Sequence, residues 1–282
     1  MSAPTLPLIS GPIETGQTPN VPVVFEDVAI AFEDHTVLDG ISFSLAHGET
    51  KAIFGTAGSG KSTLLKLSMG LIKPDRGRIY LLGNDVTEMQ EKDLFELRRQ
   101  VGIVFQESAL FDSLTVRENV AFRLMEEGHI PAEEIENRVR EALRFVELEH
   151  TLEMLPSELS GGMRRRVAIA RAIITQPEVL LYDSPTGGLD PVTSTTIIEL
   201  IIKQRDVYKT SSLLVTHRLQ DAFTMATHYF DRQDNRMKPL PPGQPCDVAM
   251  SFLILRDGKV IFDGDAQQLA ATKDEYIREY IS

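Results

Sequence analysis

One short segment constrains this chain more than any other: Gly55-Thr56-Ala57-Gly58-Ser59-Gly60-Lys61-Ser62. It matches the pattern G-x-x-x-x-G-K-[ST] in full. Its glycines allow the backbone to fold tightly, so that successive N–H groups point inward at phosphate oxygens. The apolar run Ala52–Phe54 precedes the segment and a helical stretch follows it, as a strand and a helix do around such a loop. We therefore predict a loop that binds nucleotide phosphates.

The loop also predicts which groups meet the phosphates and the metal ion. The Lys61 ammonium should reach the β- and γ-phosphates, and the Ser62 hydroxyl should ligate Mg²⁺. The positive N-terminal end of the following helix adds to the attraction for anions. ATP and Mg²⁺ are therefore the expected cofactors. We expect phosphate contacts from Gly55, Gly58, Ser59, Gly60, Lys61, Ser62 and Thr63.

Short apolar runs alternate with helical stretches along the chain and predict an α/β fold. The runs Thr50–Phe54, Val101–Phe105, Val179–Tyr182 and Leu213–Thr216 are too short for helices. Such runs are typical of strands that are buried on both faces, as in parallel sheets covered by helices. We find no internal repeat.

The middle of the chain differs from this alternation. The stretch Glu134–Val146 carries apolar residues on one face of an amphipathic helix: Ile135, Val139, Ala142, Leu143 and Val146. Leu110–Leu124 and a turn at Gly128 lie before it. We predict a helical subdomain, at about residues 107–165, inserted in the α/β core.

Three segments are predicted to lie outside this core. Residues 1–21 form a loose N-terminal tail without the charged and apolar regions of a secretory signal, and residues 271–282 form a C-terminal tail. Residues 231–250 carry Pro239, Pro241, Pro242 and Pro245 between a helix (Leu219–Tyr229) and a strand (Phe252–Leu255). We interpret this segment as a long loop inserted at the surface.

Composition excludes several classes of function. The net charge of −12 is the opposite of a nucleic-acid-binding footprint, and it also disfavours adsorption to anionic lipid. No run of about 18 apolar residues occurs, so we expect no direct insertion into a membrane. Cys246 is the only cysteine, which excludes an internal disulfide and fits a reducing compartment.

Six further features follow the order seen in ATP-binding subunits of ABC transporters, and the chain resembles that family over about residues 22–270. They are Phe32, in the place of the aromatic that stacks on adenine; Gln106, in the Q-loop; Leu159–Met163, resembling the signature LSGGQ; Val179–Asp183, resembling a Walker B strand; Gly188–Asp190, resembling the D-loop; and Thr216-His217, with the switch histidine.

The resemblance implies a fold and an assembly. The fold is a RecA-like P-loop NTPase core with a mainly parallel sheet, an antiparallel β subdomain and the inserted α-helical subdomain. In the family, the signature faces the γ-phosphate held by the other subunit, so Ser160, Gly161 and Gly162 would act in trans. Two copies would then enclose two ATP molecules, and a symmetric dimer would result.

The resemblance also implies roles for the remaining site residues. Gln106 would hold Mg²⁺ directly together with Ser62, and Asp183 would support the ion. His217 would contact the γ-phosphate, and Asp190 would lie at the dimer interface. With Lys61, these side chains make up the expected catalytic set.

Residue 184 departs from the family pattern. The family normally has glutamate after the Walker B aspartate, where it polarises the attacking water, but this chain has Asp183-Ser184-Pro185. Serine cannot accept a proton as a general base near neutral pH. Three alternatives stay open: slow hydrolysis with His217 and Gln106 orienting water, another carboxylate such as Asp190 taking over, or an ATP-held clamp with little turnover.

Finer details resemble the ATPases of lipid-trafficking MCE systems, such as the Mla-type phospholipid transporters. Met163 replaces the usual glutamine of the signature, and Phe105–Val116 and Leu155–Ser160 resemble the same group. This implies a homodimer on the cytoplasmic face of the inner membrane, bound to a multi-span permease and an MCE-type lipid-binding protein. Leu110, Phe111 and Leu114 would face the permease or pack inside the helical subdomain.

A second hypothesis is a non-transport ABC protein that acts as a regulatory nucleotide switch. That class often has two cassettes in one chain or a long coiled-coil insertion, and this chain has one cassette and no heptad insertion. The three arginines after the signature also have two interpretations. Arg164, Arg165 and Arg166 would either place charge near the phosphates or, for the first two, form a solvated helix face.

Overall fold

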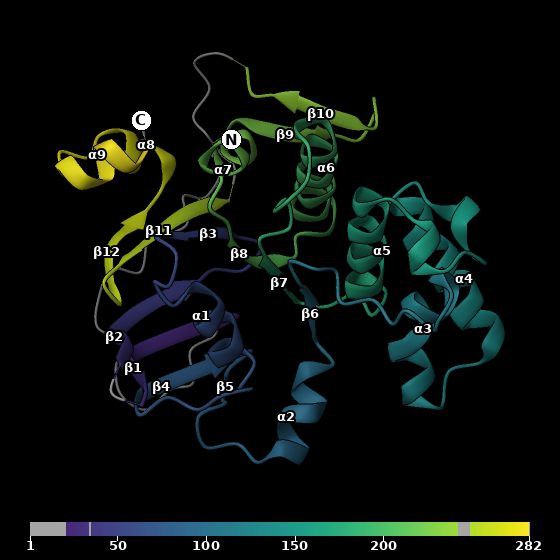
Figure 1. Cartoon of the computed structure of the whole chain (residues 1–282), viewed down its shortest axis with the longest axis horizontal. Coiled ribbons are helices and arrows are strands. Elements are labelled where there is room, and N and C mark those ends of the chain that lie inside the picture. Colours follow the sequence, from purple (N-terminus) through teal and green to yellow (C-terminus); the bar gives the residue numbers. More distant parts are fainter. Residues whose placement is uncertain (1–20, 34, 242–248, 282) are drawn as a thin grey trace, which may run out of the picture.

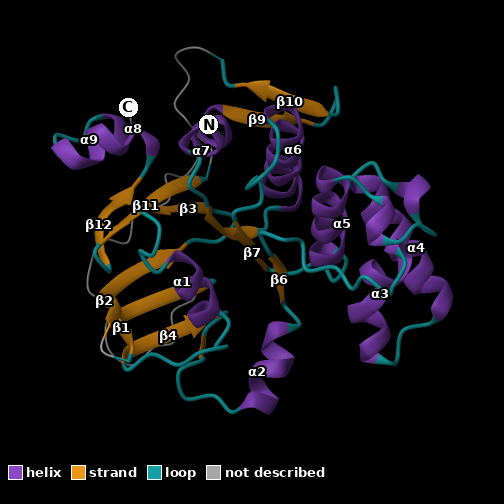
Figure 2. Cartoon of the chain, viewed as in Figure 1, coloured by secondary structure: helices purple, strands orange, loops and turns teal. Residues whose placement is uncertain are grey.

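A six-stranded sheet forms the centre of the molecule in the computed structural model, which describes residues 21–33, 35–241 and 249–281. The strand order is β12-β11-β3-β8-β7-β6, and all neighbours pair in parallel except the edge strand β12 (Figures 1 and 2). The bounds are β3 Thr50–Gly55, β6 Val101–Val104, β7 Val179–Asp183, β8 Ser211–Val215, β11 Met250–Arg256 and β12 Lys259–Gly264. The four predicted runs are therefore all strands, and the predicted mainly parallel sheet is confirmed.

Helices cover both faces of this sheet, because alternate residues of a strand point to opposite sides. Ile53 and Leu213 pack with α1 (Lys61–Ser68) in one apolar cluster, whereas Phe54 and Leu214 pack in a second cluster. The second cluster also holds apolar residues of α5 (Gly161–Ile173), α6 (Pro191–Tyr208) and α7 (Leu219–Thr227). The helices α1 and α5 thus pack on opposite faces of the sheet.

A second, antiparallel sheet packs on α1, which therefore lies between this sheet and the central sheet. Its order is β2-β1-β4-β5, and its bounds are β1 Val23–Phe32, β2 His35–Leu45, β4 Arg76–Leu81 and β5 Asn84–Asp85. Burial alternates along the second half of β2, where Ile41, Phe43 and Leu45 are buried, and Phe25 stacks on Phe43 with ring centroids 4.7 Å apart. This sheet is the antiparallel β subdomain that the family resemblance predicted.

Helices dominate the middle of the chain. They are α2 Glu91–Arg98, α3 Val116–Glu127, α4 Ala132–Phe145 and α5, with short 3₁₀ turns at Glu149–Thr151 and Pro156–Glu158. The predicted amphipathic helix is α4, in which Val139 and Leu143 are fully buried. Gly128, in the left-handed conformation, ends α3. The limits of 107–165 for a helical subdomain stay a prediction, because α5 continues past them.

The prediction of a structureless loop at residues 231–250 is wrong over its first part. A strand pair forms there, β9 (His228–Asp231) with β10 (Arg236–Pro239), and α7 accordingly ends at Thr227 instead of continuing to Tyr229. Two causes are local. The Asp231 carboxylate accepts from the amides of Gln233 and Asp234 in the turn, and Lys238 pairs with that same carboxylate. Residues 242–248 lie outside the described residues.

The prediction of a C-terminal tail at residues 271–282 is also wrong in part. After the short helix α8 (Ala266–Ala270), residues Glu275–Ile281 form α9, whose Ile277 is buried against the main core. The Tyr280 hydroxyl donates to the carbonyl of Gly55 at 3.4 Å. Burial of one helix face orders this segment. The predicted N-terminal tail at 1–21 lies outside the described residues except for its last position.

None of the helices in the described ranges has the length and apolar content needed to cross a membrane.

A buried asparagine organises the segment that enters α3. Asn119 is fully buried, and its Oδ1 accepts from the Phe111 amide at 2.8 Å. Its Nδ2 donates to the carbonyls of Phe111, Leu114 and Thr115 at 3.0–3.1 Å. Thr115 and Glu118 close a capping box at the same helix end. One side chain therefore satisfies four backbone groups of an irregular segment.

We expect Asn119→Ala to lower the free energy of unfolding by about 2–3 kcal/mol, because it leaves a cavity and removes the partners of the Phe111 amide and the Leu114 carbonyl. The matched control is Glu126→Ala on the exposed side of the same helix, which should change that free energy by less than about 0.5 kcal/mol. Urea denaturation followed by circular dichroism measures both. Equal midpoints for the two variants would contradict this account.

Candidate functional site

Four parallel strands deliver the predicted site residues to one edge of the sheet. Strands β3, β8, β7 and β6 are consecutive neighbours, so their carboxyl ends lie side by side. The phosphate loop follows β3, His217 follows β8, Asp183 ends β7 and Gln106 follows β6. Ligands of open α/β sheets bind at this edge. Residues from four distant parts of the sequence are therefore brought together.

The phosphate loop needs glycine for steric reasons at two positions. Gly60 has φ +90°, and a Cβ there would lie 2.5 Å from Leu38 Cδ2. A Cβ on Gly55 would lie 2.4 Å from Ser59 Oγ. Gly60 is also the residue that caps α1, and it provides no side-chain acceptor for the amides of the first turn. No acidic residue lies in that turn either, so an anion can satisfy these amides.

The Lys61 ammonium lies inside the loop. It donates to the carbonyl oxygens of Gly55 at 2.9 Å and Thr56 at 2.8 Å, and it contacts Ser59 Oγ at 3.4 Å. Burial lowers the pKa of Lys61, and the nearby Asp183 carboxylate opposes that effect. The ammonium is thus held in the loop by groups that phosphate oxygens can replace.

The residues present fit a magnesium ion only in combination with phosphate. Ser62 is exposed on the first turn of α1, Gln106 is exposed beyond β6, and Asp183 is half-buried at the end of β7. Hydroxyl, amide and carboxylate oxygens are ligands that Mg²⁺ accepts, and this ion usually keeps waters and substrate oxygens as well. Within the described ranges, no group of three or more His, Cys, Asp or Glu side chains could hold a metal ion.

Ser184 follows Asp183 directly, at the position where the family pattern predicts glutamate. It is 8% exposed and adopts a left-handed backbone with φ +48°. Its amide donates to the Val215 carbonyl at 2.8 Å, and its own carbonyl accepts from the Gly187 amide at 2.9 Å. The hydroxyl at this position has no general-base function at neutral pH.

The segment that resembles the signature begins helix α5. Ser160 is the N-cap, and its Oγ accepts from the Met163 amide at 3.2 Å. A Cβ on Gly162 would lie 2.3 Å from Thr193 Cγ2, so α5 begins against the start of α6. Asp190 caps α6, and hydrogen bonds from Thr193 lower the pKa of the Asp190 carboxyl group. Asp190 and the signature glycines are therefore neighbours within one chain.

The phosphate loop and the signature segment belong to opposite faces of the sheet, because α1 and α5 pack on different sides. Phe32 lies at the end of β1 with 47% of its surface exposed. The exposed ring, the phosphate loop and the strand ends are the parts of the nucleotide site predicted from the sequence, and Ser160 begins a helix that packs on the face opposite α1.

A family model described as ABC transporter matches residues 38–187, more than half of the 282-residue chain. The chain belongs to the ABC transporter family.

Relatives of known name support the same family. The chain is 36% identical to the Arabidopsis thaliana chloroplastic protein trigalactosyldiacylglycerol 3, over 90% of this chain and 71% of that protein. It is 32% identical to the Escherichia coli intermembrane phospholipid transport system ATP-binding protein MlaF, over 92% of this chain and 88% of MlaF. A dimeric ATP-binding cassette, solved in a post-hydrolysis state with ADP and Pi, matches with a TM-score of 0.72 and 29% identity over 86% of this chain and 98% of that one.

Sequence reasoning missed two buried contacts of this ABC cassette. Arg165 is 5% exposed and donates to the carbonyls of Ser184 and Gly187, so the solvated-face interpretation is wrong for this residue; Arg164 is exposed. Thr186 donates to the buried Asp221 carboxylate. The helical period carried a signal for Arg165, since residues 165, 168, 169 and 172 share one face and the last three are apolar.

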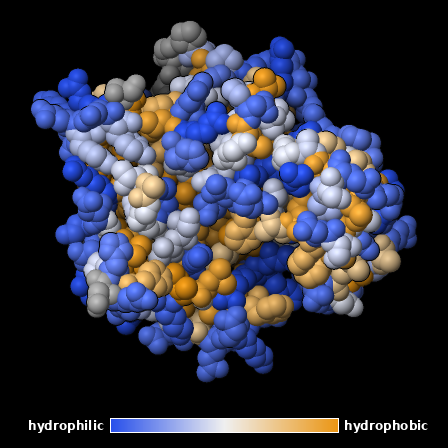
Figure 3. Space-filling view, in the orientation of Figure 1, coloured by the Kyte–Doolittle hydropathy of each residue, from blue (hydrophilic) through white to orange (hydrophobic). Residues whose placement is uncertain are grey.

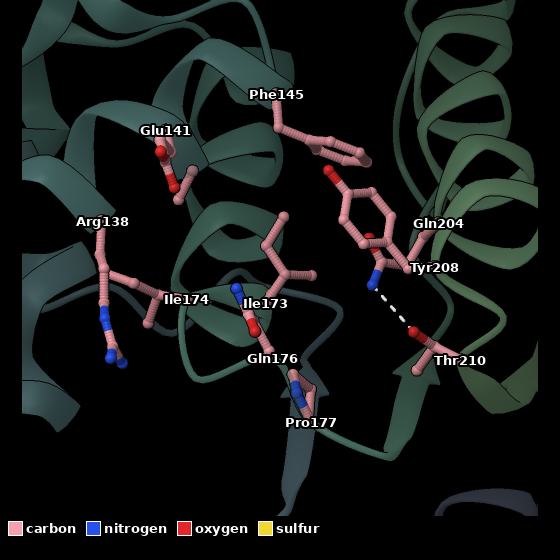
Figure 4. A pocket seen from close by; sticks show the side chains of 11 residues that line it. Arg138, Glu141, Phe145, Ile173, Ile174, Gln176, Pro177, Gln204, Tyr208 and Thr210 are labelled. Carbon is pink, nitrogen blue, oxygen red and sulfur yellow. Dashed lines mark hydrogen bonds between the residues drawn. The ribbon is translucent and has the colours of Figure 1, made fainter. Parts of the chain in front are cut away.

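A cavity of about 320 Å³ lies in another part of this ABC cassette, between α4, α5 and α6 (Figure 4). Three of its polar side chains are already engaged within the protein, because Gln204 donates to Thr210 and Arg138 pairs with Glu134. It contains none of the strand-end residues that the sequence predicts for the nucleotide site.

We expect Lys61→Ala to weaken ATP binding about 10–100-fold, because a charged hydrogen-bond donor to phosphate is lost. Lys66→Ala is the matched control, since Lys66 is exposed in the last turn of the same helix. Titration calorimetry with ATP and Mg²⁺ measures both affinities. An unchanged affinity in Lys61→Ala would place the nucleotide elsewhere.

Proposed function

We propose that this ABC ATPase drives lipid movement by a membrane permease, as part of a system for trafficking lipids across the cell envelope. The observation that carries the ATPase is the meeting of the phosphate loop, Asp183, Gln106 and His217 at one sheet edge. Similarity to a phospholipid transport ATP-binding protein along most of both chains supports the lipid class. The methionine of the signature, Met163, supports the same class.

In the proposed active form, two copies enclose two ATP molecules. The phosphate loop and the Ser160 helix end belong to opposite faces of one chain, so a second copy would supply the signature to each triphosphate. Gly161 is exposed at the start of α5, so its amide suits contact with a γ-phosphate. The dimeric cassette solved with ADP and Pi supports this arrangement.

Each site residue has a proposed role in the reaction. The Lys61 ammonium neutralises charge that develops on the γ-phosphoryl group, and the loop amides orient the phosphates. Ser62 and Gln106 hold Mg²⁺ with support from Asp183; the ion shields the phosphate charges. The exposed His217 contacts the γ-phosphate, and Phe32 stacks on adenine.

Hydrolysis is proposed to be slow because residue 184 is serine. Phosphoryl transfer depends mostly on positioning and charge stabilisation, both of which the site supplies. A positioned general base is typically worth about 10²–10⁴ in rate. In this proposal the chain keeps all its contacts with the ATP phosphates, and ATP hydrolysis lacks only the contribution of a general base at residue 184.

An apolar surface near α3 is the proposed contact with the permease. Phe111 and Phe122 are 43% and 37% exposed, and their ring centroids lie 4.6 Å apart. Met125 on the same helix is 58% exposed. Apolar colour is visible on the lobe that holds α3 and α4 (Figure 3). Exposed apolar groups of this kind mark interaction sites. Leu110 and Leu114, the other two candidates, are half-buried and offer less surface to a partner.

This contact would place the dimer on the cytoplasmic face of the inner membrane, peripheral through the permease and in a complex that includes an MCE-type lipid-binding protein. The regulatory-switch hypothesis has no support from the relatives described above.

We expect Ser184→Glu to raise steady-state ATP turnover about 10²-fold or more, because it adds the missing general base. Ser184→Gln, which has nearly the same size and no charge, is the control and should give no comparable gain. Phosphate release by the full chain in its complex measures the rates. Brisk turnover by the parent with no gain in Ser184→Glu would contradict the proposed role of residue 184.

We expect the tagged chain to co-purify with a multi-span membrane protein, and Phe111→Asp with Phe122→Asp to reduce that recovery about tenfold or more. Tyr208→Asp, at an exposed aromatic of α6, is the control and should keep the partner. Mass spectrometry of detergent extracts identifies the partners. Recovery of soluble partners alone would favour the regulatory switch.

A further inference from the structure

A buried guanidinium joins the signature helix to the turn that follows the Walker B strand. Arg165 is the fifth residue of α5, and 5% of its surface is exposed. Its Nη1 donates to the Ser184 carbonyl at 3.0 Å, and its Nη2 to the Gly187 carbonyl at 3.4 Å. No carboxylate of the described ranges lies within ion-pair distance of it.

This cation is costly to bury. Its Nε has no hydrogen-bond partner, and desolvation lowers the pKa of Arg165, opposed by the more distant Glu107. Burying a cation without an opposite charge costs desolvation free energy, which hydrogen bonds to neutral carbonyl groups offset only in part. What Arg165 does at this position therefore follows from the two carbonyl groups that it binds.

The turn at residues 184–187, to which Arg165 donates, is bonded to two different elements. The Ser184 amide donates to Val215 in β8, which fixes the turn to the sheet. Arg165 binds the carbonyls of residues 184 and 187, which fixes the same turn to α5. The left-handed backbone at Ser184 makes this turn sensitive to such restraints, because few side chains favour that conformation.

A second arginine of α5 holds the neighbouring strand end in the same way. Arg171 donates to the carbonyls of Ser108 at 2.8 Å and Ala109 at 2.7 Å. Both residues have positive φ, at 65° and 48°, and both follow Gln106 closely. One helix thus binds the backbone that follows β6 and the backbone that follows β7.

We propose that Arg165 is a positioning residue for ATP hydrolysis, which ties the turn carrying residue 184 to the signature helix. A displacement of α5 is then transmitted to the hydrolysis position of the same chain. Because the start of α5 faces the ATP of the partner copy in the proposed dimer, Arg165 links the two nucleotide sites. This role rests on the proposed assignment of the strand-end site to ATP hydrolysis.

The experiment uses the full chain with Arg165→Gln, Arg165→Lys and the control Arg166→Gln. Arg166 lies on the same helix and donates to the Val146 carbonyl, so its replacement also removes a guanidinium–carbonyl bond but leaves the 184–187 turn intact. Hydrogen exchange is measured for the segment 182–190 and for α5. Turnover and KM for ATP are measured on the same samples.

In Arg165→Gln, we expect the Gly187 amide to exchange about tenfold faster or more, because charged hydrogen bonds that hold its turn are lost. Exchange within α5 should be unchanged. The kcat should fall about tenfold with KM for ATP within about twofold. Arg165→Lys replaces the two-pronged guanidinium by one ammonium, so its amide exchange and kcat should lie between those of the parent and Arg165→Gln. This variant is used for the test if Arg165→Gln does not fold. Arg166→Gln should match the parent in the segment 182–190.

Unchanged exchange of the segment 182–190 in both Arg165 variants would overturn the anchoring of this turn. A rise of exchange throughout α5, with kcat and KM changing together, would reduce Arg165 to a structural residue. Absence of turnover in the parent and in Ser184→Glu would overturn the proposed hydrolysis instead, and the exchange measurement without nucleotide separates that failure from the first.

Discussion

The structure depends on the parallel pairing of β3, β8, β7 and β6, because this pairing places four carboxyl ends on one edge. The phosphate loop, His217, Asp183 and Gln106 come from positions as far apart as residues 55 and 217, and no local interaction joins them. Burial of both sheet faces fixes the strand register, since alternate residues enter two separate apolar clusters. A slip of one residue in β7 would move its core side chains into the opposite apolar clusters and shift Asp183 relative to the loop.

Two arginine side chains of α5 bind backbone carbonyl groups that have no partner in the sheet. The turns after β6 and β7 leave the sheet in left-handed conformations, and their carbonyl groups face α5 without strand partners. Guanidinium forks satisfy two carbonyls at once, which lysine cannot do with the same geometry. The helix that carries the signature is therefore bonded to the two loops that follow β6 and β7, although it packs on the face opposite α1.

The sequence predicted the parts of this fold whose cause is local. The glycine loop, the short buried strands and the amphipathic α4 each carry their signal within a few residues, and the order of the family motifs predicted the strand-end site. The β9–β10 pair and α9 were missed because proline content and terminal position outweighed weak strand and helix patterns; pairing between Asp231 and Lys238 and burial of Ile277 decide them. The helical period placed Arg165 on an apolar face, but its partners were missed because they are backbone carbonyl groups, which no side-chain pattern reveals.

The pairing of β3 has a consequence for folding during translation. The strand that carries the phosphate loop is made early, yet both of its neighbours, β8 and β11, come from the last third of the chain. Until β8 emerges both edges of β3 are open, and until residues beyond 250 emerge one edge stays open, as in the kind of segment that aggregates or recruits chaperones. Tyr280, which donates to the Gly55 carbonyl, arrives later still. Translation must therefore be almost complete before all the neighbours of β3 and of Gly55 are present.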